Sequence, residues 1–193
     1  MKAEKERYEV ILAGSGGQGL VLAGIMLGEA AMLEGKVVAQ TQTYEAATRG
    51  GFSMAEVIID RREIVYQQVQ DPDIVLTLTE ETLEKYASFA EKGVPVYYDS
   101  TLARSRVGPN LTGYPFTKIA SDLGKVTAAN LLALGSLIAT VPMVKAESLA
   151  QVIRRRFKGN ALELNLRALQ TGIELVKTPV IGKDEETWRP CRT

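Results

Sequence analysis

Residues 14–19 of the chain read Gly14-Ser15-Gly16-Gly17-Gln18-Gly19 and lie between two apolar runs. The preceding residues, 8–13, read as a short buried strand, and the following residues, 20–33, read as a helix. A strand, a glycine-rich turn and a helix form the first half of a β-α-β unit. Glycines suit such a turn because the chain reverses tightly and the new helix packs closely against the strand. We therefore predict an α/β fold that begins at this turn.

The same turn favours an anion. Gly14, Gly16 and Gly19 fit the dinucleotide-binding pattern G-x-G-x-x-G, and free N–H groups at the start of the next helix point outward. An NAD site also needs an acidic residue about 20 residues further on, at the end of the second strand. That strand, residues 37–39, runs into Gln40-Thr41-Gln42-Thr43 and carries no Asp or Glu there. The pattern indicates an anion or backbone-recognition site rather than a clear NAD site, and a turn used only for packing is the competing interpretation.

The rest of the chain alternates predicted strands with predicted helices. Further strands are expected at 52–60, 74–79, 94–99 and 114–119, and further helices at 80–92, 125–141, 146–157 and 161–177. This order predicts an α/β fold with a three-layer, Rossmann-like open sheet that is mostly parallel and has helices on both faces. The strand at 52–60 is the antiparallel candidate, because little helix precedes it. We expect a single domain, 1–193, with a core at about 8–177 and a C-terminal tail at 178–193.

Composition excludes several classes of function. The 193 residues include no histidine, which removes Ser-His and Cys-His schemes and histidine metal ligands. The one cysteine, Cys191, cannot by itself hold an iron–sulfur cluster, so we predict no catalytic residue and no metal site in this chain. With 23 basic and 23 acidic residues the net charge is zero, so neither nucleic acid nor an anionic membrane is expected as a partner. The charged residues 1–7 lack the apolar core of a signal peptide, which predicts a cytoplasmic protein.

A second polar stretch, residues 43–53, contains Arg49-Gly50-Gly51 between two predicted strands. An arginine with neighbouring backbone N–H groups suits a carboxylate or a phosphate. In an open sheet such a loop lies beside the first glycine-rich turn, in the crevice at the strand ends. A glycine hairpin with a solvated arginine is the equally weighted alternative.

Two predicted helices, 20–33 and 126–141, are apolar on nearly all sides. Such a helix is buried in the core, or one of its sides meets another protein chain, which includes a second copy of this one. Asn130 interrupts the second helix and needs a hydrogen-bond partner if it is buried. It bonds a neighbouring loop or faces a ligand, and the first case is the commoner one.

Several of these residues occur together in one known family. They are Gly14 to Gly19, Tyr44 with Arg49-Gly50-Gly51, Asn130 with Leu134-Gly135, Pro142, and Asn165-x-x-Ala168-x-x-x-Gly172. Over roughly residues 8–177 the chain resembles the gamma subunit of 2-oxoacid:ferredoxin oxidoreductases, the family that acts on pyruvate, 2-oxoglutarate, 2-oxoisovalerate and indolepyruvate. Many members read Tyr-Gly-x-Glu-x-Arg-Gly-Gly, whereas this chain has Ala47 in the place of that Glu and carries Glu45 instead.

The resemblance implies a subunit that is inactive alone and works in a hetero-oligomer with alpha, beta and ferredoxin-like delta subunits. The family's complex uses thiamine diphosphate, iron–sulfur clusters and coenzyme A (CoA) to convert a 2-oxoacid into an acyl-CoA, and it passes electrons to ferredoxin. The diphosphate cofactor and the clusters belong mainly to the other subunits, so this chain holds no cofactor by itself. The residues implied to contact CoA, another anion or a partner subunit are Gly14, Ser15, Gly16, Gly17, Gln18, Gly19, Arg49, Gly50 and Gly51.

Two other functions compete with this one. A self-sufficient NAD(P)-binding protein would place Arg49 near a phosphate, although the acid-free end of the second strand weakens an NAD site. A small adaptor would use the glycine turn only for packing. Titration of the chain with NAD(P)H and with CoA distinguishes the NAD(P)-binding protein from the other two functions. Co-purification with larger, cysteine-rich chains distinguishes the oxidoreductase subunit from the adaptor. Neither the specific 2-oxoacid nor the subunit stoichiometry follows from the sequence.

Overall fold

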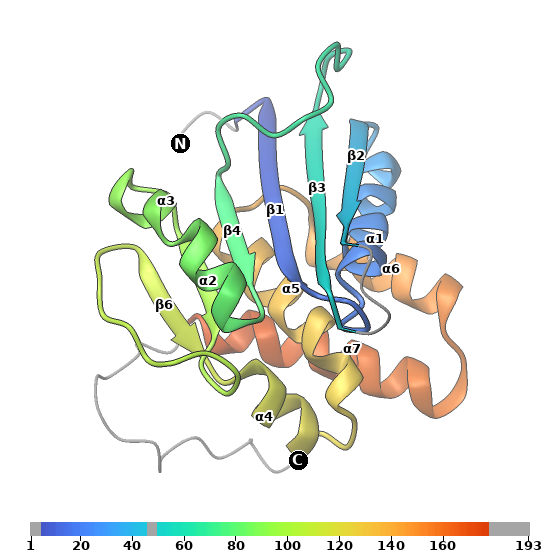
Figure 1. Ribbon diagram of the computed structural model, residues 1–193. Coiled ribbons are helices and arrows are strands. Elements are labelled where there is room, and N and C mark those ends of the chain that lie inside the picture. Colours follow the sequence, from blue (N-terminus) through green and yellow to red (C-terminus); the bar gives the residue numbers. More distant parts are fainter. Residues whose placement is uncertain (1–4, 46–49, 178–193) are drawn as a thin grey trace.

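The computed structural model describes residues 5–45 and 50–177 (Figure 1). Its strands are β1 (Arg7–Ser15), β2 (Val37–Tyr44), β3 (Phe52–Asp60), β4 (Ile74–Thr77), β5 (Val96–Asp99) and β6 (Leu111–Tyr114). Its helices are α1 (Leu20–Leu33), α2 (Glu80–Tyr86), α3 (Ser88–Glu91), α4 (Phe116–Asp122), the 3₁₀ helix η1 (Val126–Ala128), α5 (Ala129–Thr140), α6 (Ala146–Arg156) and α7 (Gly159–Leu175). The predicted tail, 178–193, and Cys191 within it lie outside the described residues.

The strands form a six-stranded sheet in the order β2-β3-β1-β4-β5-β6. β1, β4, β5 and β6 are paired in parallel, whereas β3 is antiparallel to both of its neighbours, β1 and β2. The prediction of a mostly parallel sheet with an antiparallel strand at 52–60 is therefore confirmed. The short connection from β2 explains the reversal, because a parallel neighbour requires a longer crossover.

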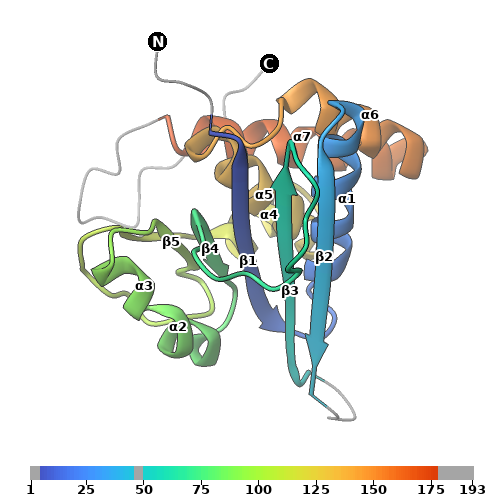
Figure 2. The same cartoon turned by 90° about the horizontal axis from the view of Figure 1, so that it is seen from above.

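Helices cover both faces of the sheet (Figures 1 and 2). The side chains of β1 explain this arrangement. Val10 and Leu12 point into a large core against α1, α4, α5, α6 and α7. Ile11 and Ala13 point the other way, into a smaller core against α2 and α3. Successive side chains of a strand face opposite sides, so a run of apolar residues is what a strand between two layers requires. The three-layer α/β arrangement expected from the sequence is confirmed.

One predicted strand is wrong. Residues 114–119 were expected as a strand, but β6 ends at Tyr114 and α4 begins at Phe116. Pro115 separates the two elements and has no N–H to continue a strand ladder. The buried residues Phe116, Ile119 and Ala120 are spaced by three and four, which is the period of a helix rather than of a strand.

Two smaller differences concern the helices. The helix expected at 80–92 is divided at Ala87 into α2 and α3, and the helix expected at 125–141 begins with the 3₁₀ turn η1. In α2 the side chain of Thr79 accepts a hydrogen bond from the N–H of Thr82, and the side chain of Thr82 accepts one from the N–H of Thr79. This reciprocal cap fixes the start of the helix directly after β4.

The two apolar helices have different surroundings. In α5 every residue from Ala129 to Ile138 is buried, which agrees with the core interpretation. In α1 one side is buried, but Ile25, Met32 and Leu33 are exposed by 37%, 65% and 39%. The sequence predicts both helices as equally apolar, and only α5 is enclosed in the described part of the chain.

Glu9 ties the N-terminal strand to the segment that precedes β4. Its Oε2 accepts hydrogen bonds from the backbone N–H groups of Gln70 and Asp71 at 2.7 and 3.0 Å, and its Oε1 accepts one from Arg7 Nε at 2.7 Å. Burial by itself raises the pKa of the Glu9 carboxyl, but the bonds from Asp71, Gln70 and Arg7 together outweigh burial and hold this pKa below its usual range.

The stability of the fold is therefore expected to fall in acid. Because folding lowers the pKa of Glu9, its carboxylate contributes stability above the pH at which it titrates in the unfolded chain, and the contribution is lost as the pH falls. Glu9→Gln, which places an amide NH₂ among N–H donors, is expected to cost about 2 kcal/mol at neutral pH and to flatten this pH dependence. Urea unfolding at a series of pH values, with exposed Glu63→Gln as the control, measures both effects. An unchanged pH profile would contradict the role of Glu9.

Candidate functional site

The glycine-rich loop joins β1 to α1 at the end of the sheet where β1 and β4 terminate. The side-chain amide of Gln18 fixes the shape of the loop with two hydrogen bonds. Its Oε1 accepts a hydrogen bond from the N–H of Ser15 at 2.7 Å, and its Nε2 donates to the carbonyl of Leu78 at 3.1 Å. A side chain of the loop thus fixes the loop to the residue after β4.

Two glycines of the loop adopt the left-handed conformation. Gly17 has φ +94° and Gly19 has φ +74°. Gly19 is the N-cap residue of α1, and its carbonyl accepts a hydrogen bond from Asn130 Nδ2 of α5 at 3.0 Å. Asn130 therefore bonds a neighbouring loop, as the commoner of its two interpretations predicts. This bond connects the loop to a helix on the main core side of the sheet.

The loop has amide groups that remain available. Within the described residues, the N–H of Gly16 donates to the carbonyl of Gly51 at 2.8 Å, and the N–H of Gln18 donates to that of Ser15 at 3.3 Å. The N–H groups of Gly17 and Gly19 have no acceptor in the same part of the chain. They lie at the N-terminus of α1, where the helix dipole favours negative charge.

The bond from Gly16 to Gly51 places the second glycine stretch directly against the first. Gly50 and Gly51 are thus beside the loop, in agreement with the place that an open sheet predicts for them. Arg49, the third residue of that stretch, lies outside the described residues. The candidate residues that the structure brings together are therefore Gly14 to Gly19, Gly50 and Gly51.

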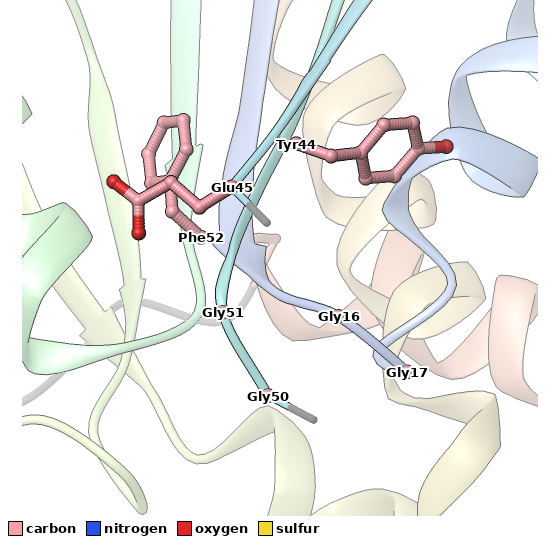
Figure 3. A pocket seen from close by; sticks show the side chains of 7 residues that line it. All are labelled: Gly16, Gly17, Tyr44, Glu45, Gly50, Gly51 and Phe52. Atoms are coloured by element: carbon pink, nitrogen blue, oxygen red, sulfur yellow. The ribbon is translucent and has the colours of Figure 1, made fainter. Parts of the chain in front are cut away.

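A first cavity of about 520 Å³ opens between these two stretches. Figure 3 shows its lining, to which Gly16, Gly17, Gly50 and Gly51 contribute backbone. The side chains of Tyr44, the last residue of β2, and of Glu45, the next residue, point in opposite directions. Glu45 brings a carboxylate to the rim, which makes this cavity less suited to an anion.

A second cavity, of about 540 Å³, lies on the other side of the loop, between the start of α1 and helices α5 and α7. Its apolar lining residues include Leu22, Met26 and Leu131. The polar lining residues are Gln18, Lys125, Thr127, Asn130, Asn160 and Asn165. Among the described residues that line it there is no Asp or Glu, and Lys125 is the one charged residue.

Sequence reasoning did not assign this second cavity. Asn165 was expected only as part of the shared motif, and Asn130 also as a residue that bonds a loop or faces a ligand; both line this cavity although they belong to different helices. Lys125, Thr127 and Asn160 carried no signal. Among the described residues no group of three or more His, Cys, Asp and Glu side chains could hold a metal ion, and no helix is long and apolar enough to cross a membrane.

Comparison with known proteins assigns the family. The family model described as pyruvate ferredoxin/flavodoxin oxidoreductase matches residues 9–175, which is most of the chain. The chain belongs to this family. The match begins in β1 and ends with α7, so it includes the glycine-rich loop and both cavities.

Two relatives match this chain over nearly their whole length. The chain is 37% identical over 179 residues to a 2-oxoglutarate synthase subunit, KorC, of Methanocaldococcus jannaschii, with 90% of this chain and 96% of that one covered. It is similar to the solved gamma subunit of a keto/oxoacid ferredoxin oxidoreductase from Geobacter sulfurreducens, with TM-score 0.74, 34% identity, and 86% and 96% of the two chains covered. These matches confirm the resemblance to the gamma subunit and identify the chain as a subunit of an oxidoreductase complex rather than a stand-alone nucleotide-binding protein.

The fold also occurs within a longer chain of this enzyme class. A 2-oxoglutarate:ferredoxin oxidoreductase from Magnetococcus marinus matches with TM-score 0.81 and 23% identity. The match covers 90% of the chain described here and 32% of the Magnetococcus chain. At this identity the likeness shows the fold alone. The same three-layer arrangement thus occurs both as a separate subunit and as a part of a larger polypeptide.

Proposed function

We propose that this gamma subunit helps to bind an anionic part of coenzyme A in an assembled 2-oxoacid:ferredoxin oxidoreductase. Thiamine diphosphate, iron–sulfur clusters and the reacting atoms are held by alpha, beta and ferredoxin-like delta subunits, and the complex reduces ferredoxin in the cytoplasm. On this proposal the chain contributes to binding and to the closure of the active-site region. It contributes no group that forms or breaks a bond.

The availability of the Gly17 and Gly19 amides carries this proposal. They belong to the residues on either side of Gln18, directly before α1, and donate to no acceptor in the described residues. Backbone N–H groups at a helix start bind phosphate oxygens well, because the dipole adds to the hydrogen bonds. Coenzyme A, which the family's reaction consumes, carries phosphates of this kind.

The second cavity fits such a ligand better than the first. The described part of its lining has Lys125 and no carboxylate, whereas Glu45 lies at the first cavity. An apolar floor with a few polar groups around it is the usual composition of a site for a small molecule or cofactor. Gln18, Gly19 and Asn130, which shape the loop, also line this cavity.

A matched pair of substitutions at Gly16 tests the proposal. A Cβ added at Gly16 has 3.7 Å to its nearest neighbour, the carbonyl oxygen of Gly51, so a side chain fits there. Gly16 itself lines the first cavity, but it precedes Gly17, which lines both cavities and carries one of the two available amides. Gly16→Asp therefore adds a negative charge next to that amide, and Gly16→Asn adds a neutral side chain of the same shape. In the assembled enzyme we expect Gly16→Asp to raise the KM for CoA by about tenfold, equivalent to about 1.4 kcal/mol, while Gly16→Asn stays near the wild type.

The same pair separates the competing roles of the loop. The KM for the 2-oxoacid is expected to be unchanged in both variants, because the charge acts on CoA. Equal CoA kinetics for Gly16→Asp and Gly16→Asn would contradict an anion site. Failure of Gly16→Asp alone to co-purify with the other subunits would instead place the loop at a subunit interface that meets a partner's acidic group.

A further inference from the structure

The outer edge of β2 is open to pairing. Within residues 5–45 and 50–177, β2 is the terminal strand of the sheet and pairs with β3 on its inner side only (Figure 2). Antiparallel pairs alternate between residues that bond each other and residues whose N–H and C=O groups point away. The N–H of Glu45 donates to the carbonyl of Phe52 at 3.0 Å, which makes this a bonded pair and fixes the alternation along β2. Val38, Gln40, Gln42 and Tyr44 therefore direct their backbone groups outward.

The two edges of the sheet differ in how well they are protected from pairing with another strand. β6, at the other edge, is four residues long and lies between Pro109 and Pro115. β2 has eight residues, Val37–Tyr44, with no proline and no charged side chain. A long edge strand without proline or charge pairs readily with another strand, and natural proteins usually avoid one unless it is covered. The edge of β2 therefore has the properties of an interface.

An apolar stripe of α1 lies next to this edge. Gly24 and Gly28 face the sheet, where added Cβ atoms would come within 3.1 Å of Gln40 and Val38 of β2. Ile25 and Met32 follow on the neighbouring side of the helix and are exposed by 37% and 65%. Exposed apolar side chains beside an unpaired strand edge form one continuous surface, which we call the β2–α1 surface.

We infer that the β2–α1 surface pairs with the same surface of a second copy of this chain. The strand carries no charge and the whole chain has zero net charge, with 23 basic and 23 acidic residues, so two copies meet without repulsion. The strand is also complementary to itself. Antiparallel pairing centred on Thr41 opposes Thr41 to Thr41, Gln40 to Gln42 and Val38 to Tyr44, and residues of the same sheet face remain opposite each other.

This arrangement has the symmetry expected of a homodimer. A two-fold axis through the two Thr41 residues joins the sheets of both copies into one continuous sheet. The same axis brings the N-terminal parts of the two α1 helices together across the new strand pair, because Gly24 packs against Gln40 next to Thr41, and it covers Ile25 of both copies. Main-chain bonds thus supply the register, and the helix side chains supply the apolar contact area.

The oligomeric state of the full-length chain tests the inference. Sedimentation velocity over a wide concentration series is expected to show a species of twice the 21.0 kDa mass of one chain. Gln42→Pro removes an N–H that points outward and leaves the β2–β3 bonds in place, so it is expected to give a monomer. Gln42→Ala removes the same side chain but keeps the N–H, and it is expected to remain a dimer.

A second pair of variants tests the helix side of the surface. Ile25→Lys places a charge in the apolar stripe and is expected to weaken the dimer at least tenfold. Leu102→Lys makes a similar substitution at a residue that is 47% exposed in the turn after β5, and it is expected to have no effect. Amide hydrogen exchange tests the register of the strand pair. The amides of Gln40 and Gln42 are expected to be protected only in the dimer, whereas those of Thr41 and Thr43, which bond β3, are expected to be protected in both states.

Three results would overturn the inference. One is a wild-type chain that stays monomeric at every concentration. Another is a dimer that survives both Gln42→Pro and Ile25→Lys, because its interface would lie elsewhere. The third is a chain that is monomeric alone but loses its partner subunits when Gln42 becomes proline, which would assign the edge to a strand of a different subunit. None of these results bears on CoA binding at the glycine-rich loop, which the Gly16 pair tests separately.

Discussion

Gly172→Ala is expected to lower the free energy of unfolding by about 3 kcal/mol, although alanine is the better helix former. Gly172 lies in α7 where it crosses α5, and a Cβ built there would overlap the carbonyl oxygen of Leu132 and lie 2.8 Å from its carbonyl carbon and 3.1 Å from the N of Ser136. These are backbone atoms of a buried helix, which cannot move aside as a side chain could. The Oγ of Ser136 also donates to the carbonyl of Gly172 at 2.9 Å, so separating the helices breaks a buried hydrogen bond.

Urea unfolding of the full chain measures this loss. Gln170→Ala is the matched control, because Gln170 is exposed on the same helix and is not among the residues buried at this crossing. It is expected to change stability by no more than about 0.5 kcal/mol. A Gly172→Ala variant as stable as Gln170→Ala would show that the two helices can separate without cost, and it would contradict the close packing described here.

Gly19→Ala is expected to destabilise the fold by about 3 kcal/mol and to disturb the glycine-rich loop at the same time. Gly19 has φ +74°, and a Cβ built there would overlap Nδ2 of Asn130. The variant therefore carries two costs: the left-handed backbone of an alanine, and the loss of the bond from Asn130 to the Gly19 carbonyl. Because the loop lies on the proposed CoA site, the KM for CoA of the assembled enzyme is expected to rise with it.

Gly35→Ala provides a control with the same backbone conformation. Gly35 has φ +75°, and a Cβ added there has no neighbour within 4 Å. Gly35→Ala is expected to lower the free energy of unfolding by about 1 kcal/mol, which is the cost of the left-handed backbone alone. The double variant Gly19→Ala with Asn130→Ala removes the overlapping side chain and is expected to lose less than the sum of its single variants. Equal losses for Gly19→Ala and Gly35→Ala, measured by urea unfolding, would exclude a structural role for the Asn130 contact.

Local sequence was sufficient for most of the fold. The glycine-rich turn between an apolar strand and an apolar helix predicted β1, the loop and α1, because strand period, turn residues and helix period all act within a few residues. The antiparallel position of β3 followed from the short connection before it. The prediction of a strand at 114–119 was wrong because this window combines the last residue of β6 with the first residues of α4. Both elements contribute apolar residues, so a short apolar run there did not distinguish a strand from a helix.

Long-range contacts decided the candidate site. Asn130 bonds Gly19 over 111 positions of sequence, and the second cavity combines residues of α1, α5 and α7. The sequence showed Asn130 as a polar residue in an apolar helix but could not choose its partner. The second cavity was not predicted, because Lys125, Asn160 and Asn165 become neighbours only when the helices pack.

The sequence by itself determined the fold class and the absence of histidine and of paired cysteines, and it predicted the glycine-rich loop as an anion or interface site. These depend on residue type and local spacing. Only the tertiary structure decided that α5 is enclosed while α1 keeps an exposed apolar side next to the edge of β2. The sequence of a helix that is apolar on all sides does not show which side faces the core. The elements that the fold packs around the helix decide which side stays exposed and can contact another chain.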